Sequence, residues 1–198
     1  MQKNLIDNLT KIIGKLPGMG PRIARRIILH LASEKSKTLG PLIENLQLLN
    51  SNIHQCKTCF NLDEGEICNI CLDPKRDKNI ICVVEEVSDV WAIERSKNYN
   101  GTYHILGGNL SAASGKTIED LHINQLLERL RQTSEVSEVI IATSPTIDGQ
   151  TTAHFLVDMF KDFSFKTTKL AHGIPVGSDL DYLDDGTIAV AFKTRSEF

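Results

Sequence analysis

The sequence contains no long uninterrupted run of apolar residues. No stretch approaches the roughly 18 residues that a membrane-spanning helix needs, although 41% of the 198 residues are hydrophobic. The first residues, Met1-Gln-Lys-Asn4, lead directly into an amphipathic pattern, without the apolar segment of a secretory signal. Internal repeats, heptads and low-complexity segments are also lacking. We therefore expect a soluble cytoplasmic protein with an ordinary globular core and no membrane partner.

Charge is unevenly divided along the chain, although its net value is only −3. Residues 1–50 contain eight Lys or Arg against three acidic residues, whereas the rest of the chain contains fourteen against twenty-two. Attraction to the phosphates of a nucleic acid requires positive charge gathered in one region. Any phosphate-binding surface is therefore expected mainly in the N-terminal segment.

Four of the five cysteines form two CxxC pairs, Cys56/Cys59 and Cys68/Cys71. Two residues between cysteines form a tight knuckle that presents both sulfurs, and Zn²⁺ prefers four such ligands in a tetrahedron at about 2.3 Å. A closed four-sulfur shell leaves no position for substrate, which predicts one structural Zn²⁺ per chain. A pair of disulfides is the alternative, and the missing secretory signal argues against it. The fifth cysteine, Cys82, lies in an apolar run and is predicted to be buried.

Two glycines and two prolines interrupt the first helical pattern. Apolar residues recur at helical spacing over residues 5–16, the pattern stops at Pro17-Gly-Met-Gly-Pro21, and a second helix follows from about Arg22. In a helix-hairpin-helix, such glycines let backbone N–H groups approach a DNA phosphate without reading the bases. An ordinary turn between helices, with both glycines serving as helix caps, is the alternative. The residues predicted to contact DNA are Gly18, Gly20, Arg22, Arg25 and Arg26, with Arg22 and Arg26 foremost.

Beyond Asp77, strand patterns alternate with helix patterns. Strands are predicted at Ile80–Val84, Tyr103–Leu106, Val139–Ala142 and Phe165–Leu170. Helices are predicted at Asp89–Arg95, His122–Gln132 and Thr152–Lys161. This alternation predicts βαβ units in a mostly parallel sheet. We therefore expect an α/β protein of several parts: helical residues 1–52, a zinc module at 53–77, the sheet region at 78–170 and a C-terminal turn and helix at 171–198.

Acidic residues follow two of the predicted strands. Glu85 and Glu86 end the first strand, and Asp148 follows the third, so all three are expected at the edge where open parallel sheets place their sites. Carboxylates there can hold Mg²⁺ for phosphoryl transfer. A further acid beside Asp148 is missing, because Thr146 and Gln150 occupy the nearest alternating positions. Mg²⁺ binding and catalysis are therefore the weaker interpretation.

The order of these parts resembles the RecR family of bacterial recombination mediators along essentially the whole chain. The matching segments are Leu16–Pro21, Cys56–Cys71, Val83–Glu86, Tyr103–Gly108, Ala142–Thr146, Gly173–Gly177 and Asp179–Tyr182. The resemblance implies a Toprim fold for about residues 78–170, the sheet shared by topoisomerases and primases. It also implies a ring-like oligomer, commonly a tetramer, that encircles or clamps DNA.

The resemblance further implies a non-catalytic role in DNA repair. Such proteins act with a RecO-type partner, and in many bacteria a RecF-type partner, to help load recombinase on gapped DNA coated by single-strand-binding protein. Glu85, Glu86 and Asp148 are then expected to contact partners. The chain departs from the family pattern at Ser144, Asp148, Gln150 and His172. Two other hypotheses are a Mg²⁺-dependent Toprim nuclease or primase-like enzyme using Glu85 and Asp148, and a zinc-stabilised adaptor that binds only proteins.

Overall fold

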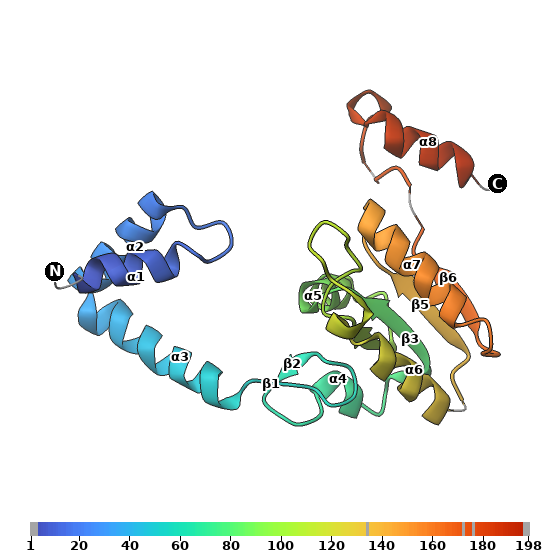
Figure 1. The fold of residues 1–198 in the computed structure, drawn as a ribbon, viewed down its shortest axis with the longest axis horizontal. Coiled ribbons are helices and arrows are strands. Elements are labelled where there is room, and N and C mark those ends of the chain that lie inside the picture. Colours follow the sequence, from blue (N-terminus) through green and yellow to red (C-terminus); the bar gives the residue numbers. More distant parts are fainter. Residues whose placement is uncertain (1–3, 134, 172, 176, 196–198) are drawn as a thin grey trace. The chain divides into compact units, whose positions relative to one another are not determined.

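The computed structural model describes residues 4–133, 135–171, 173–175 and 177–195. The chain divides into two compact units, residues 1–53 and 54–198. Figure 1 shows the helices and strands of each unit. His172, one of the departures from the family pattern, lies outside the described residues.

The first unit is helical. Asn4 begins its first helix, because the Asn4 side chain accepts a hydrogen bond from the Ile6 N–H at 3.2 Å. The second helix begins at Pro21, whose missing N–H would have had no helical partner at that position. That helix buries Ala24, Ile28 and Leu31 on one face. The helices are α1 (Leu5–Ile13), α2 (Pro21–Ser33), the π-helical η1 (Lys35–Leu39) and α3 (Gly40–Asn52).

The second unit opens with a short cysteine-containing segment. Strands β1 (His54–Gln55) and β2 (Leu62–Asp63) pair antiparallel, and the single-turn helix α4 (Asn69–Leu72) follows. The buried cluster of this segment consists of cysteines, joined by partly buried Ile70. Such a segment depends on a metal or on neighbouring elements for its stability.

A four-stranded parallel sheet forms the body of the second unit (Figure 1). The strands are β3 (Asp77–Val84), β4 (Gly101–Ile105), β5 (Glu138–Ala142) and β6 (Lys166–Lys169), in the order β4-β3-β5-β6. The prediction of a mostly parallel sheet is therefore confirmed. Because β4 and β5 flank β3 on opposite sides, the chain changes the direction of strand addition at β3. Open α/β sheets place their sites at the carboxyl ends of strands beside such a point.

Helices cover both faces of the sheet. Successive side chains of a strand point to opposite faces, so Ile81 and Val83 pack with α6 (Ile123–Gln132) and α7 (Ile147–Met159). Cys82 and Val84 point the other way and pack with α5 (Val87–Ser96). Cys82 is 2% exposed, as its apolar surroundings predict. The result is a three-layer α/β arrangement.

The remaining elements are short, and three helices differ from their predicted bounds, by one or two residues in α5 and α6 and by five residues at the start of α7. Helix α7 begins at Ile147 rather than at Thr152, because the Thr146 side chain accepts a hydrogen bond from the Gly149 N–H at 3.1 Å and caps an earlier start. None of the described helices is long and apolar enough to cross a membrane. The other elements are the 3₁₀ turns η2 (Ile118–Asp120) and η3 (Leu180–Tyr182) and the C-terminal helix α8 (Asp185–Lys193).

Candidate functional site

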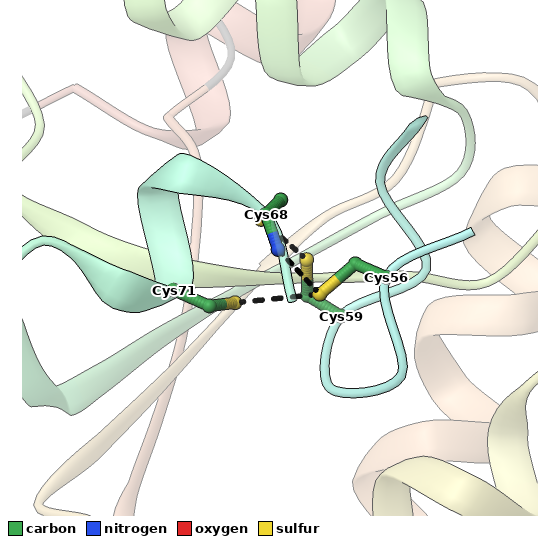
Figure 2. A group of neighbouring side chains, drawn as sticks. All are labelled: Cys56, Cys59, Cys68 and Cys71. Carbon is green, nitrogen blue, oxygen red and sulfur yellow. Dashed lines mark hydrogen bonds between the residues drawn. The ribbon is translucent and has the colours of Figure 1, made fainter. Parts of the chain in front are cut away.

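The structure brings the four predicted metal ligands together (Figure 2). Their sulfur atoms all lie within 4.8 Å of one another, with 3.5 Å between Cys59 and Cys68 and 4.0 Å between Cys56 and Cys71. A tetrahedron of sulfurs about 2.3 Å from Zn²⁺ has edges of about 3.8 Å. The four side chains therefore fit Zn²⁺ with little movement. None of these four cysteines is in a disulfide, and the sulfur separations are far beyond the about 2.05 Å of an S–S bond.

Two backbone N–H groups donate hydrogen bonds to the Cys56 sulfur. The Cys56 sulfur lies 3.4 Å from the Thr58 nitrogen and 3.3 Å from the Cys68 nitrogen. The hydrogen bond with Cys68 raises the pKa of the Cys59 thiol, and the same contact lowers the pKa of Cys68. Zn²⁺ binds the thiolate form of cysteine, and the charge of the ion balances the thiolates in this buried site.

The chemistry of the ligand set identifies the kind of metal site. Four thiolates are soft ligands that suit Zn²⁺ and fill its tetrahedral shell. Among the described residues, these cysteines are the one set of three or more His, Cys, Asp or Glu side chains placed to hold a metal. A Zn²⁺ ion here would hold the chain together and would leave no coordination position for substrate.

Glu85 lies at the carboxyl end of β3, and neutral groups hold its carboxylate. Its Oε1 accepts hydrogen bonds from the N–H and the hydroxyl of Ser144, at 2.9 and 3.0 Å. The Asn109 amide donates to Oε2 at 3.4 Å. A side chain at Gly149 would place its Cβ 2.8 Å from Oε1, so glycine lets the start of α7 approach the carboxylate. The contact with Ser144 could not be derived from the sequence, because 59 residues separate the partners.

Glu86 and Asp148 lie at the beginnings of helices. Glu86 caps α5, where its side chain and that of Asp89 each accept a hydrogen bond from the other's backbone N–H. Asp148 lies in the first turn of α7, where a negative charge is favourable beside the helix N-terminus. Gln150, in the same turn, donates to the Pro145 carbonyl at 2.9 Å. Glu85, Glu86 and Asp148 thus do not form a set of three metal ligands.

The turn between α1 and α2 presents glycines and arginines to solvent. Gly18 has a φ of +73°, which favours glycine, and Gly20 precedes α2 in an extended conformation. Apart from the adjacent residues in the chain, no heavy atom of the described residues lies within 4 Å of the Cβ position at either glycine. Arg22, Arg25 and Arg26 are exposed, and none of them forms an ion pair with any residue that the structure describes. The geometry is open to an anion, yet an ordinary interhelical turn shares it, so DNA contact stays a prediction.

Three family models match consecutive parts of the second unit. They are described as the RecR zinc finger domain with four cysteine ligands, at residues 53–73, the Toprim domain, at 79–171, and the RecR C-terminal region, at 173–196. Their order is that of the zinc site, the parallel sheet and the final helix.

Whole-chain relatives carry the name Recombination protein RecR. The one from Rhizorhabdus wittichii is 47% identical over 190 residues, which cover 96% of each chain. The one from Bradyrhizobium sp. (strain ORS 278) is 47% identical over 193 residues, or 98% of this chain and 96% of the relative. The relative from Mesorhizobium japonicum is 46% identical over the same length and coverage. Because this likeness extends over nearly the entire chain and includes the four-cysteine zinc finger and the Toprim sheet, the protein belongs to the RecR family.

Proposed function

We propose that this protein is a recombination mediator in DNA repair, which binds DNA without altering it. The observation that carries the proposal is the similarity to proteins named Recombination protein RecR over 96% or more of the chain. The acidic edge of the sheet supports the non-enzymatic part of the proposal. Both carboxylate oxygens of Glu85 accept hydrogen bonds, from Ser144 and Asn109, and these donors compete with a Mg²⁺ ion for the carboxylate.

In this proposal the first unit binds DNA through its backbone phosphates. Gly18 and Gly20 leave room for a phosphate, the N-terminus of α2 adds positive electrostatic potential, and Arg22 and Arg26 supply charge. Arg25 contributes to the same positive surface. Binding of this kind is largely independent of sequence.

The remaining parts of the proposal concern assembly and partners. Copies of the chain form a ring-like oligomer, with a tetramer as the expected state, that encircles or clamps DNA. A RecO-type protein, and a RecF-type protein where the bacterium has one, binds around Glu85, Glu86 and Asp148 and helps to load recombinase on gapped DNA coated by single-strand-binding protein. One Zn²⁺ per chain stabilises the fold, and the protein acts in the bacterial cytoplasm on the nucleoid.

Charge reversal in the first unit tests the DNA-binding assignment. The double variant R22E/R26E should bind gapped, single- and double-stranded DNA at least about 100-fold more weakly at fixed salt, because each phosphate contact is lost and replaced by repulsion. The matched control is R95E/R131E, which makes the same change of charge at two exposed arginines of the second unit. Binding is measured by fluorescence anisotropy, and circular dichroism verifies that the variants remain folded.

Equal loss of affinity in both double variants, or unchanged binding in a folded R22E/R26E protein, would refute the assigned DNA surface.

The enzyme hypothesis is tested on the same preparations, with labelled DNA and Mg²⁺ or Mn²⁺. If the wild type cleaved or extended the DNA and E85Q did not, the mediator proposal would be rejected in favour of a Toprim enzyme. If this protein bound a RecO-type protein but had no affinity for DNA itself, the hypothesis of a protein-binding adaptor would be favoured.

A further inference from the structure

Strand β4 is an edge strand that is buried along its whole length. It lies at one end of the strand order β4-β3-β5-β6, yet all five of its residues, Gly101–Ile105, are buried. An edge strand presents unpaired N–H and C=O groups that attract other strands, and proteins cover or interrupt such edges. The free edge of β4 must therefore be covered by another part of the second unit.

The first zinc knuckle, Cys56–Cys59, supplies one part of this cover. Backbone groups of a strand point alternately to its two sides, and the Leu106 N–H donates to Val84 on the β3 side at 2.9 Å. The Ile105 N–H points to the free side, where it donates to the carbonyl of the zinc ligand Cys59, also at 2.9 Å. A metal ligand thus satisfies a donor of the edge strand directly.

Arg129 of α6 supplies a second part. Its Nη1 donates to the Tyr103 carbonyl at 2.7 Å, and its Nη2 donates to the Thr102 hydroxyl at 3.2 Å. The same Nη1 reaches the carbonyl of Thr58, inside the first knuckle, at 3.4 Å. The planar fork of the guanidinium group can bind several acceptors at once. Arg129 therefore joins the edge strand to the knuckle.

An aromatic stack supplies the third part. The Phe60 ring, directly after Cys59, lies parallel to the His122 ring, with 3.7 Å between ring centroids. The His122 Nδ1 lies 2.9 Å from the Ile105 carbonyl, and because a carbonyl only accepts, Nδ1 carries the proton. Phe60 has a φ of +66°, which is uncommon for a residue with a side chain. The conformation that ends the knuckle thus also places the ring on His122.

We infer that Arg129 is a positioning residue for the zinc site, and that zinc binding and closure of the β4 edge stabilise one another. The β4 cover consists of Thr58–Phe60, His122 and Arg129. Zn²⁺ fixes the knuckle in the shape that satisfies the Ile105 N–H, and Arg129 holds the same knuckle from outside the ligand shell. The inference rests on Zn²⁺ occupying the four cysteines and is independent of DNA binding.

Zinc release tests one direction of this coupling. In R129M, transfer of Zn²⁺ to a colorimetric chelator should be about 10-fold or more faster than in the wild type, which is the usual effect of losing a partner that orients metal ligands. The control R131M, with an exposed side chain in the same helix, should release Zn²⁺ at the wild-type rate. R129K, which keeps the positive charge but loses the planar guanidinium group, should release Zn²⁺ at a rate between those of R129M and R131M. Equal release rates in R129M and wild type would overturn the inference.

Hydrogen exchange tests the opposite direction on the unmodified protein. Removing Zn²⁺ should accelerate exchange at the Ile105 amide at least about 10-fold, whereas the Val83 amide in the central strand β3 should change little. An unchanged exchange rate at the Ile105 amide, or an equal increase in exchange rate throughout β3 and β5, would contradict a local link between zinc binding and the β4 edge. This measurement therefore tests the inference even if R129M does not fold. Metal analysis of the purified wild type separately verifies the zinc content. Absence of zinc would refute both the zinc assignment and the role of Arg129, whereas a zinc-loaded protein with equal release rates in R129M and wild type would refute the role of Arg129 alone.

Discussion

The close packing around the Glu85 carboxylate depends on two neighbouring residues, Ser144 and Gly149. Ser144 donates to it twice, and Gly149 is small enough for the first turn of α7 to lie against both side chains. The residue at position 144 thus affects the same carboxylate that a partner or a metal would have to reach. A partner that binds Glu85 must either accept this hydrogen-bonded arrangement or displace Ser144.

The variant G149A tests this packing. Its new Cβ would meet the Ser144 backbone carbonyl and hydroxyl and the Glu85 carboxylate, so α7 or the Ser144 loop must move. We expect the free energy of unfolding to fall by about 1–3 kcal/mol, the usual cost of overpacking, measured by urea denaturation. G173A is the control, because no heavy atom of the described residues, apart from those adjacent in the chain, lies within 4 Å of the Cβ position at Gly173. Equal stability of the two variants would show that the chain relaxes around position 149 without strain.

Strand β4 carries a buried histidine that links its face to α6. His104 is fully buried, and its Nε2 lies 2.9 Å from the His122 carbonyl, so Nε2 carries a proton and donates it. Its Nδ1 has no hydrogen-bond partner within the part of the chain that the structure describes. Burial lowers the pKa of His104 to about 3, and the charges of Arg129 and His122 act in the same direction. The folded protein therefore holds this side chain neutral.

The pH dependence of stability follows from this lowered pKa. Below pH 6.5 the unfolded chain protonates His104, whereas the folded chain does not. The contribution of His104 to the free energy of unfolding is therefore complete above pH 6.5 and declines as the pH falls toward 3. The slope attributable to this one side chain approaches about 1.4 kcal/mol per pH unit. Urea unfolding between pH 7.5 and 5 should show this decline. Measurements in excess Zn²⁺ keep the metal site filled.

The variant H104Q isolates the histidine, because glutamine retains an N–H donor but does not titrate. Its stability should fall less steeply with decreasing pH over the same range. Parallel pH curves for H104Q and the wild type would show that other groups cause the acid sensitivity.

At the scale of the whole molecule, charge is separated into a basic first unit and an acidic remainder. If the first unit supplies the phosphate contacts, DNA affinity must depend strongly on salt. Two arginine contacts per subunit predict that the logarithm of the binding constant falls with the logarithm of salt concentration with a slope of about −1.5 or steeper. Titrations of A/T-rich and G/C-rich DNA should give the same slope and similar affinities. A shallow slope with a preferred sequence would indicate base contacts instead.

Local patterns predicted most of the secondary structure, whereas contacts between distant residues could not be predicted. The zinc ligands were identifiable because two CxxC pairs set the metal geometry almost by themselves. The alternation of strands and helices likewise predicted the parallel sheet. Helix α7 was placed too late, although its cap at Thr146 is a local contact, because Gly149 in the first turn is a poor helix former and weakens the helical pattern there. The contact between Arg129 and Thr58 joins residues 71 apart, and an isolated arginine in an amphipathic helix gives no signal of such a partner.

The position of the zinc knuckle in the chain also affects the order of folding during synthesis. Translation proceeds from the N-terminus, so the four cysteines leave the ribosome before β4, and Arg129 of α6 emerges after both. If the knuckle binds Zn²⁺ at this stage, it is already in place when the edge strand β4 appears. The arginine that joins strand and knuckle is added last. Zinc supply in the cell would accordingly influence how much newly made chain escapes aggregation.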